Sequence, residues 1–328
     1  MNVSQMIIGK APALKSLLRN VQIIAPTDVN VLITGETGTG KELIALAIQK
    51  NSSRSDNVFI ILNCAALSES LIESELFGYC KGAFKGADVD KQGIFAAANG
   101  GTLFLDEINS LPVPIQAKLS RFIESGEYVP VGSVKTLKAD VRIIASTNSN
   151  LYEQVSAGTF RRDLYFHLNV VPMELPPLRD RHKDIEILLD YFLGYFANKY
   201  AVRTPALSKD LLEILKRHPW PGNIRELRNL CEYLSIMRIK KTIELTDIPR
   251  GHLEINNDND CIDSFKLPES GMVWHEFEAD LIKQALTKAN GNCKGTSQLL
   301  GLSRDAINYR IKKYGLKPFN TPPFQRRS

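Results

Sequence analysis

Seven consecutive residues near the start of the chain have the spacing of a phosphate-binding loop. They read GETGTGK: Gly35, Glu36, Thr37, Gly38, Thr39, Gly40 and Lys41. Glycines at these places let backbone N–H groups surround a phosphate, and the lysine reaches the β- and γ-phosphates of a nucleotide. The Ser or Thr that usually follows is Glu42 here, so the hydroxyl that would hold magnesium is missing from that place. The spacing predicts nucleotide binding at this loop.

A pair of carboxylates follows a second apolar run. Residues Thr102–Leu105 are succeeded by Asp106 and Glu107. Alone, such a pair usually marks a solvated turn. At a strand tip beside a phosphate-binding loop, however, Asp106 can organise Mg²⁺ and Glu107 can polarise an attacking water. The two patterns together predict a site that binds ATP and Mg²⁺, and ATP hydrolysis is expected there.

These side chains need a scaffold that brings them to one edge. Short apolar runs alternate with amphipathic stretches up to about residue 175, which predicts an α/β fold with a parallel sheet covered on both faces. The expected strands are Val31–Ile33, Val58–Leu62, Thr102–Leu105, Val141–Ala145 and Val170–Met173, and the expected helices include Glu42–Lys50 and Pro114–Ser125.

The pattern becomes purely helical after Pro176 and Pro177. Helices are expected at Ile185–Tyr200, Ser208–Arg217 and Gly222–Met237, and Arg225 lies in the first turns of the third. A polar stretch without clear periodicity follows. The expected organisation is an α/β nucleotide-binding part (1–175), a helical subdomain (176–250), a linker (251–273), and a C-terminal module with a tail (274–328).

The C-terminal module has the pattern of a helix–turn–helix. Helices are expected at Glu276–Ala289, at Thr296–Leu300 and from Ser303 to about Tyr314. Between residues 294 and 317 there are six basic residues and one acidic residue, which suits a recognition helix in the major groove of double-stranded DNA. The residues expected on or near DNA are Lys294, Ser303, Arg304, Asn308, Arg310 and Lys312. Use of the module as a dimer predicts an inverted-repeat site.

Composition limits the remaining classes of protein. The 328 residues carry 41 Lys and Arg against 36 Asp and Glu, a net charge of +5 that matters only where it is concentrated. Five cysteines show no CxxC spacing, so a disulfide scaffold or zinc site is not expected. Neither a signal peptide nor an apolar stretch of about 18 residues is visible. A cytoplasmic protein without a membrane partner is expected.

From Ile7 to about Leu316 the chain resembles the sigma-54-interacting AAA+ transcription activators, also called bacterial enhancer-binding proteins, with a Fis-type helix–turn–helix. Their phosphate loop has the form GExGxGKE. The resemblance therefore implies that a glutamate is usual at the position of Glu42 and that Glu42 belongs to the nucleotide site. It implies that Asn63 is a switch holding the catalytic Glu107, that Asn148 is a first sensor reading the γ-phosphate, and that Arg225 is a second sensor.

The resemblance also implies ring hexamers with ATP between subunits, and RNA polymerase carrying sigma-54 as partner. Arg161 fits the first of two arginines that the family places near the subunit interface in a string like FRxDLxxRL, whereas the second is His167 here. Arg162 is an extra cation. The family often carries an N-terminal sensor domain. None is expected here, so control would come from a separate regulatory protein, from expression level, or from a nucleotide or other ligand.

The loop that engages sigma-54 reads GAFTGA in the family. The chain has GAFKGA: Gly82, Ala83, Phe84, Lys85, Gly86 and Ala87. Lys85 and His167 leave two hypotheses open. In the first, the protein remodels sigma-54 polymerase, and Lys85 makes it a poor activator. In the second, it binds DNA and ATP but acts without sigma-54. A third hypothesis, a replication initiator or helicase loader, is disfavoured by the GAFKGA loop and the Fis-like end.

Overall fold

A computed structural model describes residues 7–237, 242–248, 273–289 and 291–316. The chain divides into two compact units, residues 1–255 and 256–328. The expected linker 251–273 lies outside the described residues except for its last residue, and so does most of the expected tail. No helix in the described ranges is long and apolar enough to cross a membrane.

The first unit contains a five-stranded parallel sheet in the order β2-β5-β8-β1-β9. Its strands are β1 (Val31–Thr34), β2 (Phe59–Asn63), β5 (Thr102–Asp106), β8 (Arg142–Thr147) and β9 (Val171–Glu174). The register pairs Asn63 with Asp106 and Thr34 with Thr147, so the carboxyl ends of these strands share one edge. The predicted parallel α/β sheet is confirmed.

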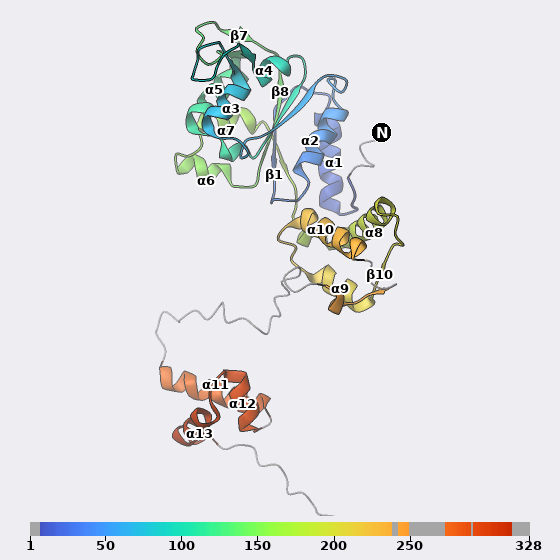
Figure 1. Cartoon of the computed structure of the whole chain (residues 1–328), viewed down its shortest axis with the longest axis vertical. Helices are drawn as coiled ribbons and strands as arrows, with labels where there is room; N and C mark the ends of the chain where they lie inside the picture. The colour runs from blue at the N-terminus through green and yellow to red at the C-terminus, as the bar shows by residue number, and fades with distance from the viewer. Residues whose placement is uncertain (1–6, 238–241, 249–272, 290, 317–328) are drawn as a thin grey trace, which may run out of the picture. The chain divides into compact units, whose positions relative to one another are not determined.

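Alternating side chains on the strands build two cores, one on each face of the sheet. Val31, Ile33 and Phe104 are buried with the helices α1 (Pro12–Ile24) and α2 (Lys41–Lys50). Leu32, Leu103 and Leu105 are buried in the other cluster, which includes residues of α3 (Glu69–Phe77), α4 (Ile94–Ala97), α5 (Val113–Ser125), α6 (Leu151–Ser156) and α7 (Arg162–Leu168). Figure 1 shows α1 and α2 on one side of the sheet and α3, α5 and α7 on the other.

Short antiparallel pairs extend the α/β part beyond the sheet. They are β3 (Gly78–Tyr79) with β4 (Lys91–Gln92), and β6 (Glu127–Tyr128) with β7 (Leu137–Lys138). A short 3₁₀ turn, η2 (Ile108–Ser110), follows the carboxylate pair. The loop 80–90 therefore starts and ends on a two-stranded ladder that holds its base.

A helical subdomain follows β9. It comprises η3 (Leu178–Arg181), α8 (His182–Lys199), β10 (Ala206–Leu207), α9 (Lys209–Arg217), α10 (Asn223–Ile236), β11 (Thr242–Ile243) and η4 (Leu245–Asp247). Its core surrounds the fully buried Trp220. The prediction of helices alone between residues 184 and 237 was wrong at β10, which pairs in parallel with β11.

The second unit holds three described helices: α11 (Trp274–Lys288), α12 (Cys293–Leu300) and α13 (Arg304–Lys313). Ile282 and Leu286 of α11 are buried against Ile307 and Ile311 of α13. Ser303 caps α13, because its hydroxyl accepts a hydrogen bond from the N–H of Ala306 at 3.2 Å. The predicted helical module is confirmed, with α12 starting three residues earlier than expected.

Candidate nucleotide-binding site and DNA-binding module

The loop Gly35–Lys41 connects β1 to α2, and its glycines have the conformations that the sequence pattern requires. Gly38 and Gly40 have φ values of 80° and 103°, in the region that favours glycine. A Cβ atom on Gly38 would also lie 2.3 Å from the carbonyl oxygen of Gly222 in the helical subdomain. The loop is therefore closely packed against that subdomain, and α2 begins directly at its end.

Lys41 is only 8% exposed, and its ammonium group is held by the loop itself. Nζ donates to the carbonyl oxygens of Gly35 at 2.8 Å and Glu36 at 3.1 Å. Burial lowers the pKa of Lys41, and the nearby carboxylates of Asp106 and Glu107 partly oppose that shift. A poorly solvated cation in this position is well placed to bind phosphate, because the interaction is weakly screened there.

The two carboxylates lie at the end of β5, as predicted. Asp106 accepts a hydrogen bond from the hydroxyl of Ser146 on the neighbouring strand β8. Glu107 has a left-handed φ of 55°, which is uncommon outside glycine and is often found at functional sites. Its N–H donates to the same Ser146 hydroxyl at 3.4 Å. The acid pair is thus positioned by Ser146, a residue for which no role was expected from the sequence.

Of three further predicted residues, Asn148 and Arg225 lie at the phosphate loop, whereas Asn63 is not hydrogen-bonded to Glu107 within the described residues. The side-chain amide of Asn148 donates to Thr37 Oγ1 at 3.2 Å, which joins β8 to the phosphate loop. Arg225 lies beside the loop, because a Cβ atom on Gly38 would be 3.1 Å from the Cβ atom of Arg225. Asn63 pairs with Asp106 in the sheet, but its side-chain oxygen accepts from the N–H of Ala65 at 2.9 Å. No described hydrogen bond joins Asn63 to Glu107.

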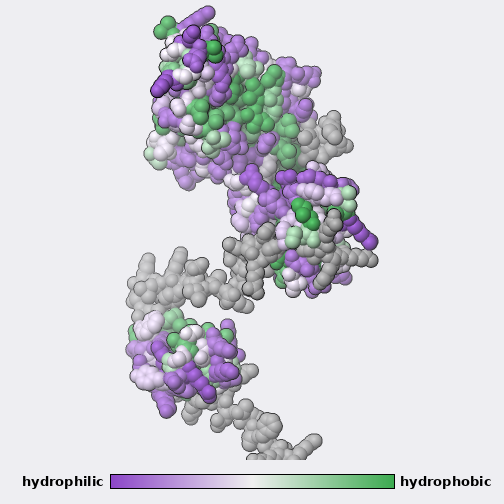
Figure 2. Space-filling view, viewed as in Figure 1, coloured by the Kyte–Doolittle hydropathy of each residue, from purple (hydrophilic) through white to green (hydrophobic). Residues whose placement is uncertain are grey.

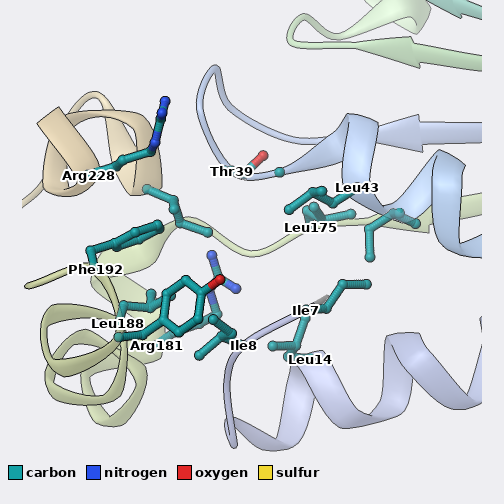
Figure 3. A pocket seen from close by; sticks show the side chains of 14 residues that line it. Ile7, Ile8, Leu14, Thr39, Leu43, Leu175, Arg181, Leu188, Phe192 and Arg228 are labelled. Carbon is teal, nitrogen blue, oxygen red and sulfur yellow. The ribbon is translucent and has the colours of Figure 1, made fainter. Parts of the chain in front are cut away.

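An apolar cavity of about 580 Å³ lies beside the loop, between the α/β part and the helical subdomain. Figure 3 shows side chains from the N-terminal segment, α1, α2 and the helical subdomain facing into it. Its lining comprises Ile7, Ile8, Leu14, Thr39, Gly40, Leu43, Ile44, Leu175, Arg181, Leu188, Tyr191, Phe192, Ile224 and Arg228. Its size and apolar walls suit a nucleoside, so the surroundings of the loop fit a nucleotide.

Arg181 is the buried cation of that lining. Figure 3 shows its side chain among those that line the cavity. Its Nε and Nη2 atoms have no hydrogen-bond partner in the described part of the chain. Burial lowers the pKa of Arg181, and the carboxylate of Asp184 partly offsets this. Neither this residue nor the cavity could be predicted from the sequence, since no local spacing marks them.

The C-terminal module presents a basic surface with one exception. Lys294, Arg304, Asn308 and Lys312 are exposed, as DNA contact would require. Arg310 instead donates from Nε to Glu278 Oε1 of α11 at 2.6 Å. Its guanidinium is therefore engaged within the module, and a role on DNA remains a prediction.

Comparisons with known families cover nearly the whole chain. Residues 7–174 match the sigma-54 interaction domain, residues 179–262 the AAA+ ATPase lid domain, and residues 275–314 the Fis family of bacterial regulatory proteins. The chain belongs to the family of AAA+ transcription regulators with a sigma-54 interaction domain. The predicted family resemblance is confirmed.

Individual relatives agree with this assignment. The chain is 42% identical over 322 residues to a putative uric acid sigma-54-dependent transcriptional regulator, UacR, of Escherichia coli K12, which covers 95% of the chain but 54% of the relative. It is 42% identical to the transcriptional regulatory protein ZraR of Salmonella typhimurium LT2, covering 93% and 68%. The chain thus spans about half the length of UacR and two thirds of ZraR. These relatives do not favour the hypothesis of a regulator that acts without sigma-54.

Solved structures give the same result. NtrX from Brucella abortus, crystallised in complex with ATP, has a TM-score of 0.70 and 32% identity, and the match covers 94% of the chain and 69% of NtrX. A second NtrX crystal structure, in complex with ADP, has a TM-score of 0.69.

The loop at the position of the family's sigma-54-contacting segment is closed by its own backbone. The N–H of Gly82 donates to the carbonyl of Ala87 at 2.8 Å, and the N–H of Ala87 donates to Phe84 at 3.0 Å. Phe84 packs edge-on against Tyr79, with ring centroids 4.9 Å apart. Lys85 is exposed and has no ion-pair partner among the described residues.

Arg161 and His167, the residues expected near a subunit interface, lie on or beside α7. Arg161 forms a two-pronged ion pair with Asp163, with the closest approach at 2.7 Å. His167 Nδ1 lies 3.1 Å from the hydroxyl of Ser120 on α5. No described hydrogen bond joins either residue to the phosphate loop of the same chain, so neither is brought to the nucleotide site by this fold alone.

Proposed function

We propose that this chain is an ATP-dependent, DNA-binding transcription regulator that acts on RNA polymerase carrying sigma-54. The observation that carries the proposal is the buried Lys41 in its phosphate loop, near the Asp106–Glu107 pair and beside an apolar cavity of nucleoside size. The family assignment and the ATP and ADP complexes of NtrX support it.

In this proposal ATP binds between the α/β part (1–175) and the helical subdomain (176–250). The phosphates contact Lys41 and the backbone of the loop at the start of α2, and the base and ribose occupy the cavity. Asn148 and Arg225 read the phosphate end. Glu42 is exposed on the first turn of α2, where a carboxylate also interacts favourably with the helix dipole.

Asp106 would hold Mg²⁺, for which carboxylate and hydroxyl oxygens such as those of Asp106 and Ser146 are fitting ligands. Bound magnesium would neutralise charge on the phosphates. Glu107 orients and polarises the attacking water, and Asn63 restrains Glu107 when hydrolysis is not required. This step needs Asn63 to leave its present contact with Ala65.

Hydrolysis is completed in a ring oligomer, with Arg161 reaching the γ-phosphate held by a neighbouring subunit. Arg161 would leave its ion pair with Asp163 and bind the phosphate instead, so that one anionic partner replaces another. Large apolar side chains are exposed at several places on the α/β part, which supports self-association: Ile23, Phe166 and Val170 are 73%, 58% and 55% exposed. Figure 2 shows apolar surface on the visible face of that part.

The module 274–328 binds double-stranded DNA as a dimer, and the loop 82–87 contacts sigma-54. Such a protein works in the cytoplasm, where DNA and polymerase are found.

ATP turnover by the purified full chain tests the enzymatic part of the proposal. We expect phosphate release that depends on Mg²⁺ and that is lost in Glu107→Gln, while that variant still binds ATP. Phosphate release by Glu107→Gln at the wild-type rate would contradict the role given to Glu107.

A further inference from the structure

Glu36, the second residue of the phosphate loop, has both of its carboxylate oxygens occupied by the helical subdomain. Arg179 donates from Nη1 to Oε2 at 2.9 Å and from Nη2 to Oε1 at 2.5 Å. Asn223 adds a third hydrogen bond, from Nδ2 to Oε2 at 3.1 Å. The hydrogen bonds from Arg179 and then Asn223 lower the pKa of Glu36. The carboxylate is therefore ionised and directed at the subdomain.

Asn223 extends this contact into the backbone on both sides. Its Nδ2 also donates to the carbonyl of Thr37 at 3.1 Å, and its Oδ1 accepts from the N–H of Leu178 at 2.7 Å. It is fully buried, with a left-handed φ of 52° that only a few residue types adopt readily. Its three bonds therefore join the loop, the start of η3 and the start of α10.

The backbone of the loop makes a parallel connection. The N–H of Ile224 donates to the carbonyl of Gly38 at 3.0 Å. Because a trans peptide directs its C=O and N–H in opposite directions, the bond from Asn223 to the Thr37 carbonyl turns the N–H of Gly38 away from the subdomain. Contacts from the subdomain thus help to set the direction of an N–H group that could bind phosphate.

We propose that Glu36 is a positioning residue that acts through Arg179 and Asn223, rather than a ligand of the nucleotide. These three residues, here called the Glu36 clamp, tie the shape of the phosphate loop to the placement of the helical subdomain. ATP binding and subdomain placement then become one coupled equilibrium. This inference rests on the proposed nucleotide site, and it replaces the expectation that Glu36 contacts nucleotide directly.

A double-mutant cycle in the full-length chain tests the clamp. The variants are Glu36→Ala, Arg179→Ala and the two together, measured for equilibrium binding of a fluorescent ATP analogue. An exposed ion pair contributes up to about 1 kcal/mol, which corresponds to about a fivefold change in affinity. We expect each single change to weaken binding about fivefold, and the double change to weaken it no further.

Hydrogen exchange at the amide of Ile224, without nucleotide, gives an independent readout of the joint. That amide is protected by its bond to Gly38. Both single variants should exchange faster there, by about the same factor. The matched control is Glu213→Ala, which removes an exposed contact with Lys216 on α9 of the same subdomain and should leave both measurements unchanged.

Two results would overturn the clamp. One is unchanged exchange at Ile224 in both single variants. The other is an effect on ATP affinity that multiplies in the double variant, since that outcome would mean that Glu36 acts independently of Arg179. Failure of the wild-type chain to bind the analogue at all would instead refute the nucleotide site, while exchange at Ile224 would still report on the clamp.

Discussion

Lys41 illustrates how a single side chain prepares a site for a charged ligand. Its ammonium group is largely removed from water, and its hydrogen bonds within the described residues go to two neutral carbonyl oxygens of its own loop. Exchange of these neutral partners for phosphate oxygens replaces ordinary hydrogen bonds with charge-assisted ones, which are roughly twice as strong. The low exposure of Lys41 therefore favours ligand binding more than it favours the empty loop.

Replacement of this lysine should be costly for binding. Lys41→Ala removes at least two charge-assisted contacts worth about 1.5–3 kcal/mol each, so the affinity for a fluorescent ATP analogue should fall by at least about a hundredfold. Lys50→Ala, an exposed lysine at the end of the same helix, serves as control. Equal affinities of Lys41→Ala and wild type in an equilibrium titration would exclude the assigned phosphate site.

Lys85, unlike the buried Lys41, is an exposed cation, and it stands where the family has threonine. Burying an unpaired ammonium against a partner costs several kcal/mol, and a loss of about 1.4 kcal/mol already means tenfold weaker engagement. We expect Lys85→Thr to raise the rate of open-complex formation on a sigma-54 promoter, and Lys85→Thr with His167→Arg to raise it further. Lys81→Thr, in the same loop, should have no such effect. A rate for Lys85→Thr at or below wild type would show that Lys85 is tolerated.

At the scale of elements, α8 and the N-terminal segment are held together by one buried carboxylate. Asp184 accepts from the N–H groups of Lys10 and Ala11 at 2.5 and 3.0 Å, and it lies near the buried Arg181. Both the segment and α8 contribute side chains to the cavity. The shape of the cavity therefore depends on this attachment.

Removal of that carboxylate should destabilise the first unit. Asp184→Ala leaves the buried N–H of Ala11 and the partly buried N–H of Lys10 without their acceptor, and Arg181 without its neighbouring anion, so the free energy of unfolding should fall by about 2–4 kcal/mol. Urea unfolding can be followed through the buried Trp220, with Trp274 replaced by Phe in all proteins. The exposed Asp190→Ala on the same helix is the control. Equal unfolding midpoints for the two variants would argue against this role of Asp184.

The recognition helix α13 makes a prediction about salt. Lys312 is exposed on its last turn, where a lysine would contact phosphate and not a base edge. Lys312→Ala should weaken binding to all duplexes about equally and lower the slope of log K against log salt concentration by about one. Lys283→Ala on α11 should leave the slope unchanged. A wild-type slope in Lys312→Ala would place Lys312 away from the DNA backbone.

Local patterns account for what could be predicted at this scale. The apolar runs of β1, β5 and β8 and the amphipathic stretches of α2 and α5 have clear periods, so they were located within a few residues. The pair β10–β11 was missed because two-residue strands have no period to detect, and residues 208–241 separate them in the chain. Their pairing is decided by the tertiary fold alone.

In the whole molecule too, the parts of the site that lie close together in sequence could be predicted, and the parts brought together by the tertiary fold could not. The phosphate loop and the Asp106–Glu107 pair are contiguous in sequence, so their spacing was sufficient. Arg179, Arg181 and Asn223 reach the site only because the helical subdomain folds back beside a loop that lies more than 140 residues earlier, as the separation of 143 between Arg179 and Glu36 illustrates. Neither composition nor periodicity predicts contacts between residues so far apart in the sequence.

Open-complex formation on a sigma-54 promoter by the purified full chain tests the central claim most directly, because it requires nucleotide binding, hydrolysis and polymerase engagement at once. The proposed function predicts promoter melting that depends on ATP, occurs more slowly than with Lys85→Thr, and disappears in Lys41→Ala and Glu107→Gln. Melting that proceeds equally without ATP, or its absence in both the wild type and Lys85→Thr, would contradict the proposed function.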